Sequence, residues 1–410
     1  MFEVFAAICA LVICYLTYEV YKEHMDDVIV VGAAHSPGVW PKSMRNEKGF
    51  VRGYDVRTGR RLWIFHTVPM AGEFGAETWL NDSREYTGNT GAWAQMSADE
   101  ELGLVYVPTE APTNDAYGGH RPGDNLFGNS VLALDLKTGR RVWHFQTSHH
   151  DIWDWDLVSG PILFDVVIDG RAVKGIASLG KTCYVYMLNR ETGKPINPIV
   201  ETAVPTTTDV PGEEVWPTQP IPYTSAGIPQ QPFCATYPRV TDPALVPRVR
   251  QSFHPHQVNE FVIVAPGLMG GANYGSPSFS LRTGLLYATG KNDAWSINVK
   301  PVGDTLEPGP GNLGHFAGFS EQGEIGFVPT ATLAAYDPTT GERVWYTEVP
   351  GTTNAGNLVT AGDLVFQGIG TGDFYAFDAE TGEPVGQVVT NEVPYRIAPA
   401  TNFRLFYFAS

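Results

Sequence analysis

The chain has 410 residues, with 27 Lys and Arg against 44 Asp and Glu, which gives a formal net charge of −17. An acidic balance of this size argues against nucleic acid as a partner, because binding to phosphates needs a basic footprint. The 44 glycines, 31 prolines and 12% aromatic residues favour many short strands joined by tight turns. The length allows one large β domain or two to three ordinary domains.

Residues 1–25 form an apolar N-terminal segment, in which the run from Val4 to Tyr18 is almost wholly hydrophobic between Glu3 and Glu19. The run is short for a membrane span, which needs about 20 residues. It also lacks the basic start of a secretory signal. Three interpretations stay open: a short uncleaved anchor, an imperfect signal, or non-native sequence from a misplaced start.

A repeated phrase of the type Asp-x-x-Thr-Gly-x-x-x-Trp runs through residues 26–410. The three clear copies are 53–63, 133–143 and 335–345, and two weaker copies are 188–193 and 376–382. Each copy predicts a strand, a turn and a second strand. The Asp side chain can accept from the turn amides, the Gly takes a positive φ, and the Trp begins the next strand.

The spacing of the copies predicts a β-propeller. Asp337 and Asp378 are 41 residues apart, and Asp55 and Asp135 are 80 apart, close to twice that step. A period of about 40–45 residues with several short strands per unit is typical of propeller blades. We count five to six blade-like units and expect Trp63, Trp143 and Trp345 to be buried between blades as equivalent anchors.

The segment His149-His150-Asp151-Ile152-Trp153-Asp154-Trp155-Asp156 follows a strand-like run and is the strongest candidate for chemistry. Carboxylates crowded beside aromatic rings are costly to desolvate unless they bind a cation, form pairs or exchange protons. A catalytic base beside a metal ion and a flat cofactor fits that setting. The alternative is a solvated surface loop. The adjacent histidines are not expected to bind zinc, because neighbours in a strand point to opposite faces, and we expect them to orient the loop.

Residues 195–255 interrupt the repeats with a proline-rich insertion that contains Trp216-Pro217-Thr218-Gln219-Pro220. A long irregular segment on a rigid scaffold is often a lid or a substrate loop. A covering for blade edges is the alternative. The sequence leaves open whether Cys183 and Cys234 pair, and it contains no Cys-x-x-Cys-His haem motif.

Taken together, the repeats and the segment at 149–156 resemble the quinoprotein dehydrogenases, which use pyrroloquinoline quinone (PQQ). The match looks closest to the branch of membrane-bound glucose and polyol dehydrogenases and covers about Val28 to Asp378. The resemblance implies an all-β fold, the β-propeller of the quinoprotein alcohol dehydrogenase type, which has eight blades in the family. It also implies PQQ and Ca²⁺, or another divalent cation, near the propeller axis.

The resemblance implies roles for five residues. Asp154 matches the catalytic aspartate and a ligand of the cation, and Lys181, 27 residues later, matches a basic residue that contacts the quinone oxygens. Trp93 matches the indole on which PQQ lies, and Asn273 matches a quinone-contacting asparagine. Asn114 is the best candidate for a cation-ligating amide. As an alternative to these roles, Asp154 would be a strand-end cap, Lys181 a surface lysine, Trp93 a core residue and Asn114 a turn residue.

The implied activity is oxidation of a sugar, polyol or alcohol hydroxyl to a carbonyl, with hydride transfer to the quinone and Asp154 as the base. Electrons would leave to membrane quinone or to a separate carrier. The implied location of the protein is the periplasm, and anchoring to the inner membrane stays open. Three departures favour a non-catalytic or truncated propeller that acts as a scaffold. The stretch 32–37 has no carboxylate where the family has an acidic cation ligand, about two N-terminal blades have no counterpart, and we expect an unfinished blade after Gln387.

Overall fold

The computed structural model describes residues 27–34, 46–301, 315–320 and 327–389, without the side chains of 300–301 and 315–320. The apolar segment 1–25 and the residues after 389 lie outside this range, so the expectations for both ends stay predictions. Within the described residues, none of the helices combines the length and the apolar character needed to cross a membrane.

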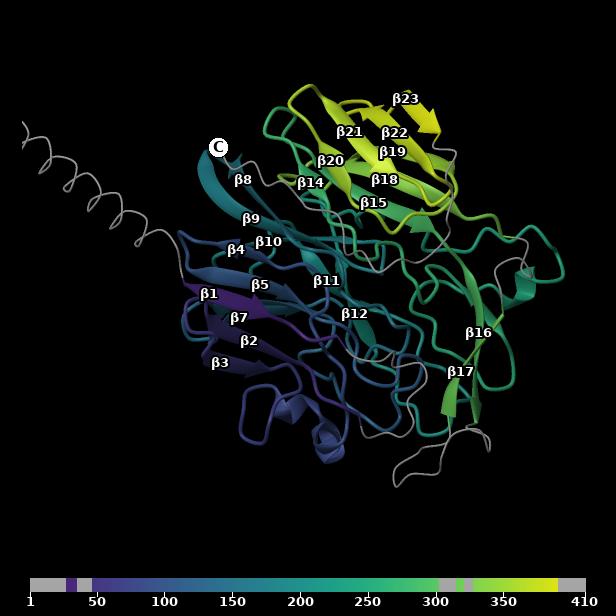
Figure 1. The fold of residues 1–410 in the computed structure, drawn as a ribbon. Coiled ribbons are helices and arrows are strands. Elements are labelled where there is room, and N and C mark those ends of the chain that lie inside the picture. The colour runs from purple at the N-terminus through teal and green to yellow at the C-terminus, as the bar shows by residue number, and fades with distance from the viewer. Residues whose placement is uncertain (1–26, 35–45, 302–314, 321–326, 390–410) are drawn as a thin grey trace, which may run out of the picture.

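The described chain is nearly all β, which confirms the predicted fold class (Figure 1). Three sheets have four strands, in the orders β4-β5-β6-β7, β14-β15-β18-β19 and β20-β21-β22-β23. Their bounds are β4 Ser97–Asp99, β5 Leu104–Pro108, β6 Ser130–Asp135, β7 Arg141–Gln146, β14 Ser278–Phe279, β15 Leu286–Asn292, β18 Thr330–Tyr336, β19 Arg343–Pro350, β20 Asn357–Val359, β21 Leu364–Gly368, β22 Asp373–Asp378 and β23 Pro384–Val389. Paired strands in these sheets are antiparallel.

Two three-stranded sheets also have the form of blades, β1-β2-β3 and β10-β9-β8. Their bounds are β1 Val28–Val31, β2 Phe50–Asp55, β3 Arg61–His66, β8 Ile162–Ile168, β9 Arg171–Leu179 and β10 Val185–Asn189. Five blade-like sheets are therefore visible, at the lower end of the predicted five to six. The described sheets are separate from one another and do not close into a single barrel.

The remaining elements lie between blades. They are β11 Ile199–Ala203 paired with β12 Thr218–Pro222, β13 Val262–Val264 in a sheet with β16 Trp295–Pro301 and β17 His315–Ser320, and the 3-10 helices η1 Ala76–Thr78, η2 Leu80–Glu85 and η3 Val246–Arg248. The β16–β17 hairpin is inserted between β15 and β18, and it extends away from their sheet (Figure 1).

The repeated turns have the predicted structure. In the copy between β6 and β7, Asp135 Oδ1 accepts from the Thr138 amide at 2.8 Å and from the Thr138 hydroxyl at 2.7 Å. Gly139 follows with φ +68°. The same pair of contacts recurs at Asp55 with Thr58 and at Asp378 with Thr381.

The three tryptophans are equivalent anchors between successive blades, as predicted, but Trp345 is only partly buried whereas Trp63 and Trp143 are buried. The indole nitrogens of Trp63, Trp143 and Trp345 donate to the carbonyls of Leu136, Arg190 and Ala379, at 2.9, 3.0 and 3.1 Å. Each acceptor directly follows the Asp or Asn that begins the next repeated turn. Each ring also lies on the glycine of that next turn, where a Cβ would meet the indole. The repeat therefore encodes both the turn within a blade and the contact between blades.

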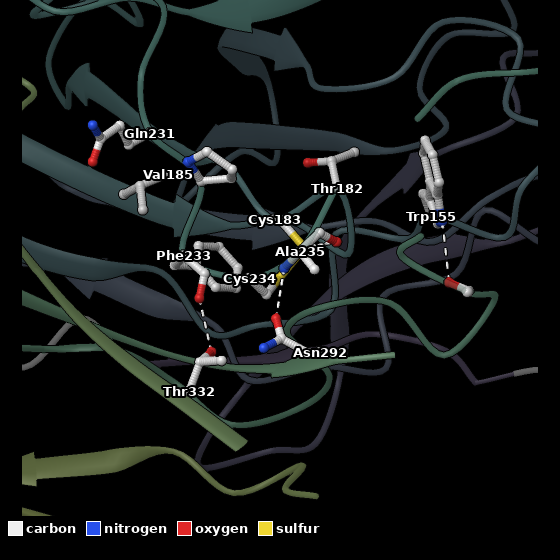
Figure 2. The surroundings of a disulfide bond; sticks show 12 residues. Trp155, Thr182, Cys183, Val185, Gln231, Phe233, Cys234, Ala235, Asn292 and Thr332 are labelled. Atoms are coloured by element: carbon white, nitrogen blue, oxygen red, sulfur yellow. Dashed lines mark hydrogen bonds between the residues drawn. A yellow bond between two sulfur atoms is a disulfide. The ribbon is translucent and has the colours of Figure 1, made fainter. Parts of the chain in front are cut away.

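A disulfide joins Cys183 to Cys234, with Cα atoms 5.2 Å apart (Figure 2). It ties the loop after β9 to the proline-rich insertion. Phe233 is buried beside it in the core shared with the β14–β19 sheet, and its carbonyl accepts from the Thr332 hydroxyl at 2.7 Å. Because this part of the insertion is core, the structure favours a fixed covering over a mobile lid.

Candidate active site

The segment 149–156 is buried, so the interpretation as a solvated surface loop is wrong. Asp151, Trp153 and Trp155 are each about 1% exposed. The two indoles stack with centroids 5.2 Å apart, and Phe253 from the far end of the insertion packs edge-on against both. Buried apolar rings therefore alternate with the carboxylates along this segment.

Asp151 holds the backbone of this segment in place. Its carboxylate accepts from the amides of Trp153 at 2.9 Å and Trp155 at 2.8 Å, and from the Asn129 side-chain amide at 2.9 Å. Burial raises the pKa of Asp151 to about 6, although the hydrogen bond from Trp153 opposes the shift. The residue between the two bonded amides, Asp154, has φ +57°, a conformation uncommon outside glycine and often found at functional sites.

Asp154 and Lys181 meet directly. Lys181 Nζ donates to Asp154 Oδ2 at 2.9 Å and to Asp156 Oδ2 at 2.8 Å. The other oxygen of Asp156 accepts from the Ala111 amide at 2.6 Å, so both oxygens of Asp156 are hydrogen-bonded. The Lys181 side chain is 3% exposed, whereas that of Asp154 is 19% exposed. Asp154 is therefore the member of this cluster that an incoming molecule can reach.

The carboxylates of the cluster shift one another's pKa. Burial and the nearby charge of Asp156 raise the pKa of Asp154 well above the ordinary value, and Lys181 opposes this. Burial and Asp156 likewise raise the pKa of Asp115, whose carbonyl accepts from the Asp154 amide at 3.1 Å. Burial disfavours the charge of Lys181, but Asp154 and Asp156 outweigh burial and raise its pKa, so Lys181 stays protonated. A buried carboxylate with a raised pKa is a stronger base once it is ionised.

Trp93 offers a flat aromatic face in the loop between η2 and β4. Its ring lies 6.2 Å from that of Tyr274, with 12° between the ring planes, and both residues are only half-buried. Asn273, next to Tyr274, donates from its side chain to the Met269 carbonyl at 3.1 Å. The same segment reaches Lys181, because the Gly271 amide donates to the Lys181 carbonyl at 2.9 Å. Residues 271–274 thus connect Lys181 with the ring facing Trp93.

Asn114 has the geometry of a turn residue, which was the alternative to its metal role. Its Oδ1 accepts from the Ala116 amide at 2.9 Å, and its side chain is buried. Its carbonyl accepts from Arg121, a fully buried guanidinium that also binds the carbonyls of Thr113 and Asp151. Within the described residues, no group of three or more His, Cys, Asp or Glu side chains is arranged to hold a metal ion. The roles of Asp154 and Asn114 as cation ligands therefore stay predictions.

The two histidines of the segment fix the proline-rich insertion to the site. His150 Nε2 lies 2.8 Å from Glu213 Oε1, and both side chains are almost completely buried. His149 lies between Asp124, at 2.7 Å, and Glu201 of β11, at 3.0 Å. Burial opposes the charge of His149, but the hydrogen bonds with Asp124 and Glu201 outweigh it and raise its pKa to about 9. The prediction that these histidines orient the loop is confirmed.

Sequence reasoning missed several residues of this region. Asp156 follows Asp154 by two positions, and this spacing could have indicated that Asp156 also contacts Lys181. Asp115 and Glu213 gave no signal, because Asp156 and His150, with which they interact, lie far away in the sequence. Arg121 gave none because its partners are mostly main-chain carbonyls. The same holds for Lys291 on β15, a buried lysine whose amide donates to the Gly271 carbonyl at 3.0 Å.

Comparison with known proteins places the chain in a family. Residues 22–312 match the model of the glucose/ethanol/alcohol dehydrogenase β-propeller domain, and residues 329–394 match the model described as outer membrane protein assembly factor BamB. The large subunit of glycerol dehydrogenase from Gluconobacter thailandicus is 29% identical over 83% of this chain and 54% of that protein. Quinoprotein glucose dehydrogenase A from Acinetobacter calcoaceticus is 41% identical over 40% of this chain and 20% of that protein.

Among solved structures, the quinohemoprotein alcohol dehydrogenase ADHIIG from Pseudomonas putida HK5 is 25% identical. It superposes with a TM-score of 0.64 over 89% of this chain and 51% of that chain. The chain spans about half the length of the relatives that it matches along most of its own length. The matched family model covers well over half of the 410 residues. The chain therefore belongs to the β-propeller family of the PQQ-dependent glucose, ethanol and alcohol dehydrogenases.

Proposed function

We propose that this chain oxidises a hydroxyl group of a sugar, polyol or alcohol to a carbonyl, with PQQ as cofactor and Asp154 as the base. The observation that carries the proposal is the contact of Asp154 with Lys181 at 2.9 Å, in a buried cluster from which only Asp154 is part-exposed. Family membership supports the class of reaction. Assays with sugars, polyols and alcohols distinguish among these three substrate classes.

The candidate residues have the chemistry to hold PQQ, a flat and multiply charged molecule. The half-buried rings of Trp93 and Tyr274 provide aromatic faces for a flat ring system. Lys181 and the side-chain amide of Asn273 provide donors for quinone oxygens. Bound PQQ would supply an electrophilic quinone carbon that accepts a hydride.

The chain's own residues would then handle the proton and the developing charge. Asp154, once ionised, accepts the hydroxyl proton of the substrate, and its raised pKa suits that transfer. Lys181 remains bonded to Asp156 after Asp154 is neutralised, so the ammonium keeps its position through the reaction. From that position it donates to an oxygen on which negative charge develops.

We also propose that Asp154 is a ligand of Ca²⁺ or another divalent cation, with Asn114 as a second ligand. Carboxylate and amide oxygens are the ligands that Ca²⁺ prefers. The described residues do not by themselves form a full ligand set, and Asn114 Oδ1 is occupied by the Ala116 amide. Ligation by Asn114 would use the second lone pair of this oxygen.

The proposed location is the periplasm, with association to the inner membrane left open. The disulfide between Cys183 and Cys234 supports an oxidising compartment. We propose membrane quinone or a separate carrier as the electron acceptor.

The test is to add PQQ and Ca²⁺ to the purified chain and to follow dye reduction with a panel of sugars, polyols and alcohols. Asp154→Asn should lower the rate by about 10²- to 10⁴-fold, because an amide cannot accept the proton, while PQQ stays bound. Asp169→Asn is the matched control, since Asp169 is exposed and also has a positive φ, of +49°. Equal rates for Asp154→Asn and the wild type would remove Asp154 from the mechanism. Failure of the wild type to bind PQQ would favour the scaffold alternative.

A further inference from the structure

Lys291 is a buried lysine with an unusual set of partners. Its residue is 5% exposed, and its Nζ donates to the neutral Asn354 Oδ1 at 2.7 Å. The nearest carboxylate along the chain, Asp293, uses one oxygen to accept from Trp295 Nε1 and has no hydrogen-bond partner for the other. No ion pair joins Lys291 to a carboxylate within the described part of the chain. By contrast, Lys181 is bonded to two carboxylates.

The main chain places Lys291 beside the candidate active site. Gly271 donates to the Lys181 carbonyl at 2.9 Å and accepts from the Lys291 amide at 3.0 Å, so the two lysines flank this one glycine. A Cβ at Gly271 would lie 1.9 Å from Cys234 Sγ, which shows how closely the segment is packed on the disulfide. The segment cannot move away easily, and the position of Lys291 relative to Lys181 is therefore fixed.

Of these two buried lysines, Lys291 has no carboxylate bonded to its ammonium group among the described residues, although the charge of nearby Asp293 favours its protonated form. The carboxylates that neutralise Lys181 are Asp154 and Asp156, and both are already bonded to it. An ammonium group has three donors, and Asn354 occupies one of those of Lys291. Burying a cation is costly unless an anion compensates it, and a bound ligand with a permanent negative charge would do so.

We infer that Lys291 and Asn354 form an anion subsite that binds one carboxylate of PQQ. This inference rests on the proposed function. The carboxylates of PQQ are charged in both redox states, whereas its quinone oxygens carry charge only after reduction. The ammonium group of Lys291 is buried whichever redox state of PQQ is bound, so a PQQ carboxylate, which is charged in both states, is its better partner.

Equilibrium binding of PQQ to the full chain tests the inference without relying on turnover. Oxidised PQQ, and PQQ kept reduced under anaerobic conditions, are titrated at fixed Ca²⁺. Lys291→Met should raise the Kd of both forms by about 10- to 100-fold, as expected for loss of one charge-assisted hydrogen bond. Lys291→Arg should retain most of the affinity. Lys194→Met, an exposed lysine in a repeated turn, is the control and should bind like the wild type.

Asn354→Asp separates an anion subsite from a purely structural role. The new carboxylate would pair with Lys291 and occupy its charge, so PQQ affinity should fall although the lysine is still present. A structural role predicts instead that this variant binds PQQ as the wild type does, because the side chain keeps its size and its contact with Lys291.

Proton uptake gives a second measurement. Burial lowers the pKa of Lys291 to about 8, with Asp293 opposing the shift and Lys181 adding to it. The residue paired with Lys291 on β18 is the uncharged Ala331. A carboxylate bound to Lys291 favours its protonated form, so binding at pH 8.5 should take up protons, and Lys291→Met should lose this uptake. Calorimetry in buffers of different ionisation enthalpy measures it.

The outcomes separate the two proposals. If the wild type binds PQQ and Lys291→Met binds equally well, the subsite is wrong and the proposed function stands. If only the reduced form loses affinity, Lys291 faces a quinone oxygen and the carboxylate assignment is wrong. If the wild type does not bind PQQ, both proposals are overturned.

Discussion

Replacing Lys181 by methionine should destabilise the protein in a way that depends on its two carboxylate partners. Methionine keeps the length of the side chain but leaves Asp154 and Asp156 without the ammonium that lies 2.9 and 2.8 Å from them. Removing one partner of a buried ion pair costs about 3–5 kcal/mol. Because Asp154 is 19% exposed, and water reaches it, we expect a loss of about 3 kcal/mol in the free energy of unfolding at pH 7.5.

The loss should depend on pH in a definite direction. Burial and Asp156 raise the folded-state pKa of Asp154, and a raised pKa contributes stability at low pH that is lost as pH rises through the folded value. Lys181 opposes this rise, so in Lys181→Met the folded-state pKa of Asp154 is higher than in the wild type. More stability is then lost as the pH rises toward 7.5. The difference in stability between the wild type and Lys181→Met should therefore be small near pH 4 and grow toward pH 7.5.

Urea denaturation of four proteins measures this coupling: the wild type, Lys181→Met, Asp154→Asn and the double variant. Adding Asp154→Asn to Lys181→Met removes one uncompensated charge, so the double variant should recover about 1–3 kcal/mol relative to strict additivity. Additive effects, or a Lys181→Met protein as stable as the wild type at pH 7.5, would refute the charge argument.

Two further predictions concern the proline-rich insertion. Replacing both Cys183 and Cys234 by serine opens a loop with a sequence separation of 51, and chain entropy predicts a loss of about 4 kcal/mol, measured by urea unfolding; a loss below 1 kcal/mol would contradict it. The raised pKa of His149, about 9, contributes stability that is present below the unfolded-state value and is lost as pH rises through 9. Limited proteolysis should therefore cleave the insertion faster at pH 10 than at pH 8, whereas His149→Gln should show cleavage that hardly changes between these values.

The propeller architecture could be predicted because each repeated phrase specifies both a turn within a blade and a contact with the next blade. Asp135, Thr138 and Gly139 form one turn within five residues, and Trp143 reaches the next turn because the blades follow one another at a regular step. The blade count was also close, since each turn marks one sheet. The proline-rich insertion could be located but its role could not, because Phe233 is core only through its contacts with a distant sheet.

The candidate site was predicted in part. Asp154 and Lys181 came from the resemblance, and the structure brings their side chains into contact. The amide of Asn114 was assigned to a cation, and here it holds a local turn, which a sequence motif cannot distinguish from ligation. Lys291 could not be identified from the sequence as a candidate site residue. Its proximity to Lys181 arises because both residues form main-chain hydrogen bonds with Gly271.

The same limit applies to the histidines. His149 and His150 were expected to orient the loop, but their partners Glu201 and Glu213 lie 52 and 63 residues away. A pattern of neighbouring residues does not encode such pairs. Buried ion pairs across long separations are where the sequence is least informative, and the functional cluster of this protein consists largely of them.

A crystal structure of the full chain with PQQ and Ca²⁺ tests the central claim most directly. We predict PQQ on the face of Trp93, its quinone oxygens within hydrogen-bond distance of Lys181, and the open oxygen of Asp154 directed toward the quinone. PQQ bound elsewhere, or with its quinone end away from Asp154 and Lys181, would contradict the account.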